Sequence, residues 1–270
     1  MSGSWRSSRN IRENIQSELM SEIKAFPYNE EPKDVKSKVV GYWSKRSGSF
    51  SDARHGELHS HKGDAWKAEL LSKLPQKKAL KILDVGCGTG FFEMLLSPEG
   101  FQMTGIDLTP EMIEEGKALI QRHGAANAKL LVMDAEHPDF PDETFDCVIS
   151  RNLTWTLPHP ADAYKEWYRV LKTGGVLLNY DAEYAKGFHS FDQTENLAHK
   201  NLDKEQIEEC HDIYHMLSIS AFDRPEWDIR ILLQIGFREI AVDPSVGDRL
   251  YAEKDEFYIP DRMFCVRAVK

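Results

Sequence analysis

Residues 82–92 read Ile-Leu-Asp-Val-Gly-Cys-Gly-Thr-Gly-Phe-Phe, and this stretch decides the fold. The run of aliphatic residues that ends at Val85 predicts a short strand, and glycines follow at positions 86, 88 and 90. An apolar helical pattern begins directly after the third glycine. The stretch therefore predicts a strand, a tight turn and a helix, the unit in which backbone N–H groups at the start of a helix can meet a ligand.

The spacing of the glycines narrows the class of ligand. Gly-x-Gly-x-Gly after Asp84 differs from the Gly-x-Gly-x-x-Gly of dinucleotide-binding proteins, which disfavours a nicotinamide-dependent oxidoreductase. Asp84 stands at the end of the predicted strand. We expect its carboxylate there either to brace the turn or to hold a cation through water.

Strand and helix patterns alternate along the chain after this unit. Strands are predicted at 80–85, 101–106, 129–133, 145–150, 176–181, 237–243 and 263–269, and helices at 90–97, 110–123, 161–172 and 225–235. The alternation predicts an α/β fold with a doubly wound, parallel sheet and right-handed crossovers. No convincing long helix separates the last two strands, so the last strand is predicted to pair antiparallel.

Two helical segments fall outside this alternation. Residues 1–74 show helical patterns at 11–23, 34–46 and 62–74, and the Ser/Gly-rich stretch 47–51 predicts a loop between the last two. Residues 184–223 are polar, rich in His and Glu, and helical in pattern around 204–217. We therefore expect an N-terminal helical segment or lid at 1–74 and a core domain at 75–270, with a helical cap inserted at about 184–223.

Composition excludes several classes of protein. The formal net charge of −10 argues against a broad nucleic-acid surface, which needs clustered Lys and Arg. No apolar run approaches the roughly 18 residues that cross a bilayer, and residues 1–10 lack the apolar core of a secretory signal. The four cysteines lie far apart in sequence and predict free thiols in a reducing cytoplasm. We expect a cytoplasmic monomer or homodimer that does not bind membranes.

Polar residues follow several of the predicted strands. In a parallel sheet the strand carboxyl ends share one edge, where ligands bind, which places the glycine turn, Asp107, Asp134 and 151–152 together. Asp107 can accept hydrogen bonds from both hydroxyls of a ribose, or alternatively cap helix 110–123. Asp134 and Ala135 stand where an adenine amino group could be recognised, although Asp134 could also be an ordinary surface acid.

A series of motifs in this region resembles a known family. The motifs are Leu83-Asp-Val-Gly-Cys-Gly-Thr-Gly90, Gly105-Ile-Asp-Leu108, Met133-Asp-Ala135, Phe145-Asp-Cys-Val-Ile-Ser150 and Arg169-Val-Leu-Lys-Thr-Gly-Gly175. Together they resemble class I S-adenosylmethionine-dependent methyltransferases, most closely the small-molecule branch. The resemblance covers about residues 80–182. It implies a Rossmann-like sheet of seven strands, mainly parallel with the last strand antiparallel, and S-adenosylmethionine as the cofactor.

The resemblance also implies roles for individual residues. Gly86, Gly88 and Gly90 would pass under the methionine part of the cofactor, Asp107 would bind the ribose, and Arg151 would lie near the methionyl end. The full set of cofactor-binding candidates is Asp84, Gly86, Cys87, Gly88, Gly90, Asp107, Leu108, Asp134, Ala135 and Arg151.

The sequence differs from that of related methyltransferase families, and the differences limit the kind of methyl acceptor. The fourth strand ends in Ser150-Arg-Asn-Leu-Thr-Trp155, not in the Asn/Asp-Pro-Pro-Tyr run of methyltransferases that act on nucleic-acid amino groups. We expect a small-molecule acceptor and direct displacement, with a base needed only if the acceptor arrives protonated. The candidate bases are Tyr42, Tyr184 and His189, and the candidate substrate-binding residues are Arg46, Asn152, Trp155 and Tyr180; for each, a packing or surface role is the alternative.

No metal is expected in the reaction. His211 and His215 stand four residues apart, a spacing found in metal sites, but a third ligand cannot be named. The alternative function is a non-catalytic protein on the same fold that binds S-adenosylmethionine or S-adenosylhomocysteine without turnover.

Overall fold

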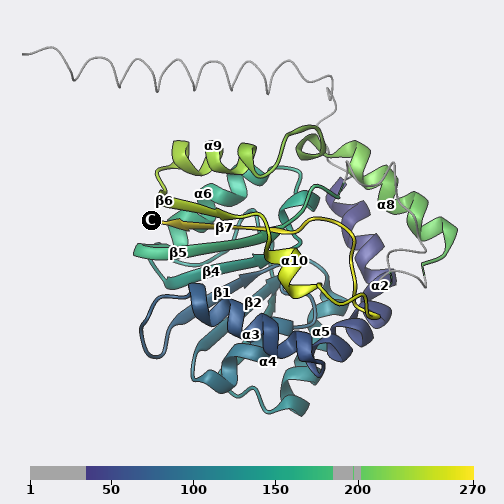
Figure 1. Ribbon diagram of the computed structural model, residues 1–270, viewed down its shortest axis with the longest axis horizontal. Helices are drawn as coiled ribbons and strands as arrows, with labels where there is room; N and C mark the ends of the chain where they lie inside the picture. The colour runs from purple at the N-terminus through teal and green to yellow at the C-terminus, as the bar shows by residue number, and fades with distance from the viewer. Residues whose placement is uncertain (1–34, 185–196, 198–201) are drawn as a thin grey trace, which may run out of the picture. The chain divides into compact units, whose positions relative to one another are not determined.

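The computed structural model describes residues 35–184, 197 and 202–270. The helix predicted at 11–23 and the candidate base His189 lie outside these residues. Elements are labelled as in Figure 1.

The centre of the fold is a sheet of seven strands in the order β3-β2-β1-β4-β5-β7-β6 (Figure 1). The strands are β1 (Lys81–Val85), β2 (Gln102–Asp107), β3 (Ala128–Val132), β4 (Phe145–Arg151), β5 (Leu171–Asp181), β6 (Arg238–Asp243) and β7 (Phe264–Val269). β1 to β5 pair in parallel, and β7 runs antiparallel to both of its neighbours, β5 and β6. The predicted topology is confirmed.

Helices cover both faces of the sheet. The helices are α2 (Val35–Leu58), α3 (His61–Lys73), α4 (Phe91–Leu96), α5 (Pro110–His123), α6 (Pro160–Val170), α8 (Lys204–Met216), α9 (Glu226–Ile235) and α10 (Val246–Leu250), with 3-10 helices at Ser97–Glu99, Thr154–Thr156 and Ser218–Ala221. α6 and α9 lie on one face, and α3, α4 and α5 lie on the other (Figure 1). The fold is therefore doubly wound, as predicted. None of the described helices combines the length and the apolar composition needed to cross a membrane.

The loop predicted at residues 47–51 is wrong, because α2 continues through it without a break. The hydroxyls of Ser47 and Ser49 donate to the carbonyls of Ser44 and Arg46, at 3.0 and 3.1 Å, so these serines bond inside the helix instead of ending it. Phe50 packs edge-on against Trp43, with ring centroids 5.4 Å apart. Tertiary packing therefore overrides the low helix propensity of serine and glycine here.

Strand β5 also begins earlier than predicted. It starts at Leu171 and includes Gly174 and Gly175, which were expected in the connection before it. Leu171 pairs with Phe145, and the register shifts before Val176 pairs with Cys147. The two glycines therefore lie within this irregular part of the ladder, which is a common role of strand glycines.

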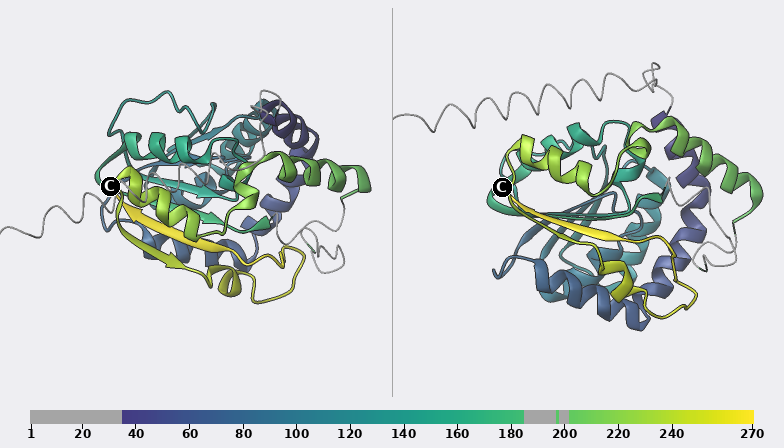
Figure 2. Two further views of the ribbon diagram at one scale, coloured as in Figure 1. Left: turned by 90° about the horizontal axis from the view of Figure 1, so that it is seen from above. Right: turned by 45° about the horizontal axis from the view of Figure 1, so that its top comes forward.

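Helices α2 and α8 lie across the carboxyl ends of the parallel strands in both views of Figure 2. Lys45 on α2 joins Glu209 on α8 through an ion pair of 3.0 Å. Ser44 on the same helix donates to Glu111 on α5, at 2.9 Å. These contacts fix α2 over the edge of the sheet where ligands bind in this class of fold.

Candidate active site

A cavity of about 220 Å³ lies at the carboxyl ends of the strands, beneath α2 and α8. Most of the predicted site residues line it: Tyr42, Arg46, Asp84, Gly86, Cys87, Gly88, Asp107, Leu108, Asp134, Ala135, Arg151, Asn152, Trp155 and Tyr184. They come from separate strand ends and from α2. The topology of the sheet therefore brings together residues that the sequence separates by more than a hundred positions.

The glycine turn forms the floor of the cavity. The N–H groups of Gly86 and Cys87 donate to the carbonyl of Ile106, at 2.8 and 3.0 Å, which ties the end of β1 to β2. Gly88 has a φ of 53°, and a Cβ there would lie 3.2 Å from the ring of Phe50 on α2. Only glycine fits such a left-handed, closely covered position without strain.

Gly90 does not line the cavity. It occupies the cap position at the start of α4, with a φ of 85°, and a Cβ there would lie 3.2 Å from Ile120 on α5. This glycine therefore allows the turn and the close packing of α5, while Gly86 and Gly88 belong to the floor of the cavity.

Two carboxylates mark one end of the cavity. Asp107 accepts hydrogen bonds from the N–H groups of Gly88 and Thr109, at 3.0 and 2.9 Å. Burial raises the pKa of Asp107, although these backbone hydrogen bonds oppose the shift. Asp134 accepts from the N–H of Glu136 at 2.9 Å and from the ammonium of Lys36 on α2 at 2.6 Å. Each carboxylate keeps lone pairs for a ligand.

An acid pair lies beneath the turn. Asp84 and Glu93 are both almost fully buried, at 2% and 0% exposed. Burial, followed by the charge of Glu93, raises the pKa of Asp84 well above its ordinary value, and burial raises the pKa of Glu93 to about 8. The pair therefore keeps at least one proton at neutral pH. The two roles predicted for Asp84, bracing the turn and holding a cation through water, both stay predictions.

Glu93 was not recognised from the sequence. The available signal was an acidic residue at the start of an apolar helix directly after the glycines. Its carboxylate also explains Gly105 on β2, because a Cβ there would lie 2.4 Å from it.

Arg151 belongs to a buried polar network around Glu57 of α2. Its Nη2 donates to both oxygens of Glu57, at 2.8 and 3.0 Å, and to the hydroxyl of Tyr251 at 2.6 Å. Glu57 also accepts from Arg54 and from the indole of Trp66. Burial alone would raise the pKa of Glu57, but Arg151 and Arg54 lower it below its ordinary value. The network fixes Arg151 at the cavity wall.

The opposite end of the cavity is aromatic. The ring of Trp155 lies 4.7 Å from that of Tyr214 and 5.4 Å from that of Tyr184, between centroids. Tyr42 accepts a hydrogen bond of 2.9 Å from Arg46. Burial is the main cause that raises the pKa values of Tyr42 and Tyr184. Both phenols are therefore neutral at pH 7, which disfavours them as bases.

Most buried polar side-chain atoms without a hydrogen-bond partner in the described residues belong to the cavity wall. They are Nε of Arg46 and Arg54, Oγ1 of Thr89, Nε and Nη1 of Arg151, Oδ1 of Asn152 and Nε1 of Trp155. Leaving such atoms unpaired in a dry site costs about 1–3 kcal/mol each. Their concentration at one cavity indicates a ligand with several polar groups.

Tyr180 was predicted to bind substrate, and the structure contradicts this. Its side chain is fully buried on the other face of β5 and packs against Trp66 of α3, with ring centroids 5.1 Å apart. Its hydroxyl donates to Glu69 at 3.3 Å. Successive side chains of a strand point to opposite faces, so standing near a strand end did not place Tyr180 in the cavity.

The two histidines of α8 lie side by side. The Nε2 atoms of His211 and His215 are 2.9 Å apart. Within residues 35–184, 197 and 202–270, no three side chains of His, Cys, Asp or Glu come together in a group that could hold a metal ion.

Comparison with known proteins points to the same part of the chain. Residues 83–179 match the sequence model of a family described as a methyltransferase domain. Demethylmenaquinone methyltransferase of Geobacillus sp. (strain WCH70) is 29% identical over 148 residues, which are 53% of this chain and 59% of that protein. Phosphatidylethanolamine N-methyltransferase of Cereibacter sphaeroides is 38% identical over 105 residues, 38% of this chain and 51% of that protein. The chain spans little more than half the length of these curated relatives.

A solved structure shows the same fold. Phosphoethanolamine N-methyltransferase 2 of Haemonchus contortus, in complex with phosphomonomethylethanolamine and S-adenosylhomocysteine, aligns with a TM-score of 0.56. The alignment covers 76% of this chain and 52% of that chain, at 21% sequence identity. At this identity the likeness concerns the fold.

Proposed function

We propose that this chain, whose residues 83–179 form a class I S-adenosylmethionine-dependent methyltransferase domain, transfers a methyl group to a small-molecule acceptor by direct displacement. The observation that carries the proposal is the single cavity that joins the glycine turn, Asp107 and Asp134 at one end to an aromatic, polar wall at the other. S-adenosylmethionine supplies a methyl group on a sulfonium, which is already a good leaving group. The residues of the chain then have to align the acceptor and exclude water.

The cofactor end of the cavity fits the groups of S-adenosylmethionine. Asp107 would accept the ribose hydroxyls, which form stronger hydrogen bonds with a carboxylate than with a neutral acceptor. Leu108, Asp134 and Ala135 would border the adenine, and Gly86 and Gly88 would leave room for the methionine part against the backbone.

Arg46 provides a site for an anion. The residue is 5% exposed, and its guanidinium donates to Tyr42 and lies over the rings of Tyr42 and Trp43. In the described part of the chain no carboxylate pairs with it. A buried cation needs an anionic partner, so a carboxylate of the cofactor or an anionic group of the acceptor would bind here.

The covering elements would set the choice of acceptor. α2 contributes residues from Lys36 to Arg54 to the cavity wall, and α8 contributes Ile207, Cys210 and Tyr214. These contacts support a lid within 1–74 and a cap within 184–223. Relatives named for demethylmenaquinone and for phosphatidylethanolamine support an organic acceptor that is not a macromolecule.

The proposal is tested by measuring release of S-adenosylhomocysteine by the purified chain. The assay supplies S-adenosylmethionine with a demethylated quinol, an ethanolamine phospholipid and small amines, and runs with and without EDTA. We expect turnover with at least one acceptor and equal rates in EDTA, because the sulfonium needs no metal to activate it. Cofactor binding with no turnover on any acceptor would instead support the non-catalytic alternative. Loss of turnover in EDTA that a divalent ion restores would contradict a metal-free reaction.

A further inference from the structure

The aromatic end of the cavity contains one acidic side chain, Asp261, that sequence patterns did not indicate. Asp261 is half-buried, lines the cavity and lies in the segment between α10 and β7. It acts electrostatically on both Tyr184 and Tyr214. Trp155 packs against these same two rings. Asp261 therefore shares the lining of this cavity with Trp155, Tyr184 and Tyr214.

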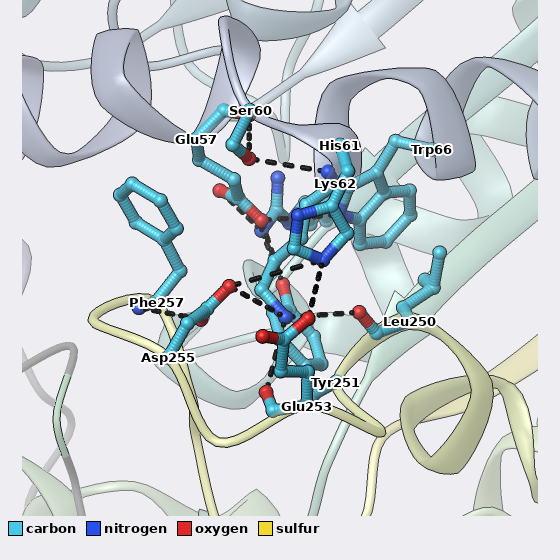
Figure 3. Close-up of polar contacts among 11 residues, drawn as sticks. Glu57, Ser60, His61, Lys62, Trp66, Leu250, Tyr251, Glu253, Asp255 and Phe257 are labelled. Carbon is cyan, nitrogen blue, oxygen red and sulfur yellow. Dashed lines mark hydrogen bonds and ion pairs between the residues drawn. The ribbon is translucent and has the colours of Figure 1, made fainter.

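A buried lysine anchors the segment that carries Asp261. Figure 3 shows Lys62, at the start of α3, reaching into the segment that begins at Leu250. Its ammonium, fully buried, donates to the carbonyls of Leu250 and Glu253, both at 3.3 Å, and pairs with Asp255 at 3.2 Å. Tyr251, the next residue after Leu250, donates a hydrogen bond of 3.0 Å from its hydroxyl to Glu57. The segment is thus fastened before it reaches the cavity, which presents Asp261 from a fixed support.

Asp261 has no counter-ion within residues 35–184, 197 and 202–270. The groups that face it are Tyr184, which follows β5, and Tyr214 of α8, and both phenols have raised pKa values through burial. Two other charged groups, Arg151 and Asp181, act on Tyr184, and each has a counter-ion. Arg151 pairs with Glu57, and Asp181 pairs with Arg224 at 2.8 Å. The thiol of Cys210 interacts with Tyr214, and burial raises the pKa of this thiol.

We propose that Asp261, with Trp155, Tyr184 and Tyr214, forms a subsite for a cationic amine acceptor, and that Asp261 takes the proton from its ammonium group. This inference rests on the proposed methyl transfer. An unpaired carboxylate beside several aromatic faces is the arrangement that attracts an ammonium, through charge and through cation–π contact. A neutral hydroxyl or ring carbon gains nothing from the cation–π contact.

The proton transfer makes the nitrogen a nucleophile. One N–H bond of the ammonium breaks and its proton passes to a carboxylate oxygen of Asp261, which leaves the lone pair on nitrogen. That lone pair forms the N–C bond to the methyl group while the C–S bond breaks, and the bonding pair moves to sulfur. The products are the methylated ammonium, neutral Asp261 and S-adenosylhomocysteine. Asp261 returns its proton to water when the product leaves.

The acidity of Asp261 suits this role. Burial raises the pKa of Asp261 to about 6, which makes it a stronger base than an exposed aspartate while it remains mostly ionised at pH 7. Because the carboxylate form is the active one, kcat/KM for the amine is expected to rise with pH through about 6. Neither Tyr184 nor Tyr214 titrates in this pH range. Asp261 is therefore the group among the three that accounts for the rise of kcat/KM near pH 6.

The test compares Asp261→Asn with Glu256→Gln, a matched control on the same segment whose side chain is exposed. Calorimetry on protein loaded with S-adenosylhomocysteine measures binding of tetramethylammonium, with tert-butyl alcohol as the neutral probe. We expect Asp261→Asn to weaken tetramethylammonium binding at least tenfold and to keep cofactor affinity within about threefold. It should also lower kcat/KM for a primary amine at least tenfold and abolish the rise of kcat/KM with pH near 6. The control variant should match the wild type in each measurement.

Two results separate this inference from the proposed function. If tetramethylammonium binds no better than tert-butyl alcohol, or equally well to Asp261→Asn, the amine subsite is refuted, even where a quinol is methylated. If the cation binds in an Asp261-dependent way but no acceptor is methylated, the subsite stands and the methyltransferase proposal fails.

Discussion

Replacing Asp107 by alanine is expected to weaken S-adenosylmethionine binding by about 10- to 150-fold. The estimate follows from about 1.5–3 kcal/mol for a lost hydrogen bond to a charged group. Two effects add in the same direction. Under the proposed function the ribose hydroxyls would lose their acceptor, and the N–H groups of Gly88 and Thr109 lose the partner that shapes the turn. Isothermal titration calorimetry with S-adenosylmethionine and S-adenosylhomocysteine measures the change.

A control variant separates this effect from a general loss of charge. Asp139 is exposed and does not line the cavity, so Asp139→Ala should bind like the wild type. Asp107→Asn keeps an acceptor oxygen, so its affinity for S-adenosylmethionine should lie between those of Asp107→Ala and Asp139→Ala. Wild-type affinity in Asp107→Ala would show that the ribose lies elsewhere.

Replacing Glu57 by glutamine is expected to lower the free energy of unfolding by about 3–5 kcal/mol, the usual cost of removing one partner from a buried ion pair. Glu57 is fully buried and is the shared acceptor of Arg54, Arg151, Trp66 and Tyr251. Without its charge, two buried guanidinium groups remain without compensation. Urea unfolding measures the change as a lower midpoint at constant slope.

Two further variants test the cause of this destabilisation. Asp52→Asn changes an exposed acid on the same helix and should leave stability within about 0.5 kcal/mol. Combining Glu57→Gln with Arg151→Met removes one of the uncompensated cations and should recover part of the loss. A Glu57→Gln variant as stable as the wild type would mean that the network does not stabilise the fold.

The gathering of the glycine turn, Asp107 and Asp134 at one cavity could be predicted because its signals are local. The strand, the glycines and the helix around Gly88 lie within a dozen residues, and the alternation of elements places Asp107 and Asp134 at the same edge. The predicted sheet of seven strands, mainly parallel with an antiparallel last strand, is confirmed for the same reason. Short-range patterns and a general rule of topology sufficed.

The acceptor end depends on pairs that are distant in sequence. Glu57 meets Arg151 across 94 positions, and Lys62 meets Glu253 across 191 positions, so no spacing could indicate either. Asp261, which lines the cavity, lies eight residues after Glu253 on the segment that this second contact holds. Tyr180 was wrongly predicted to bind substrate because it lies near the end of a strand. Its side chain points to the core instead.

The continuity of α2 determines how the cavity can open. Its 24 residues make a rod about 36 Å long. Lys36, near one end, bridges Asp134 and Glu136, and Glu57, near the other, holds Arg151 and Tyr251. A hinge at 47–51 would have let half of the rod swing away alone. An unbroken rod fastened at both ends would have to detach as a unit, so under the proposed function entry of the cofactor and departure of the product would share this one step.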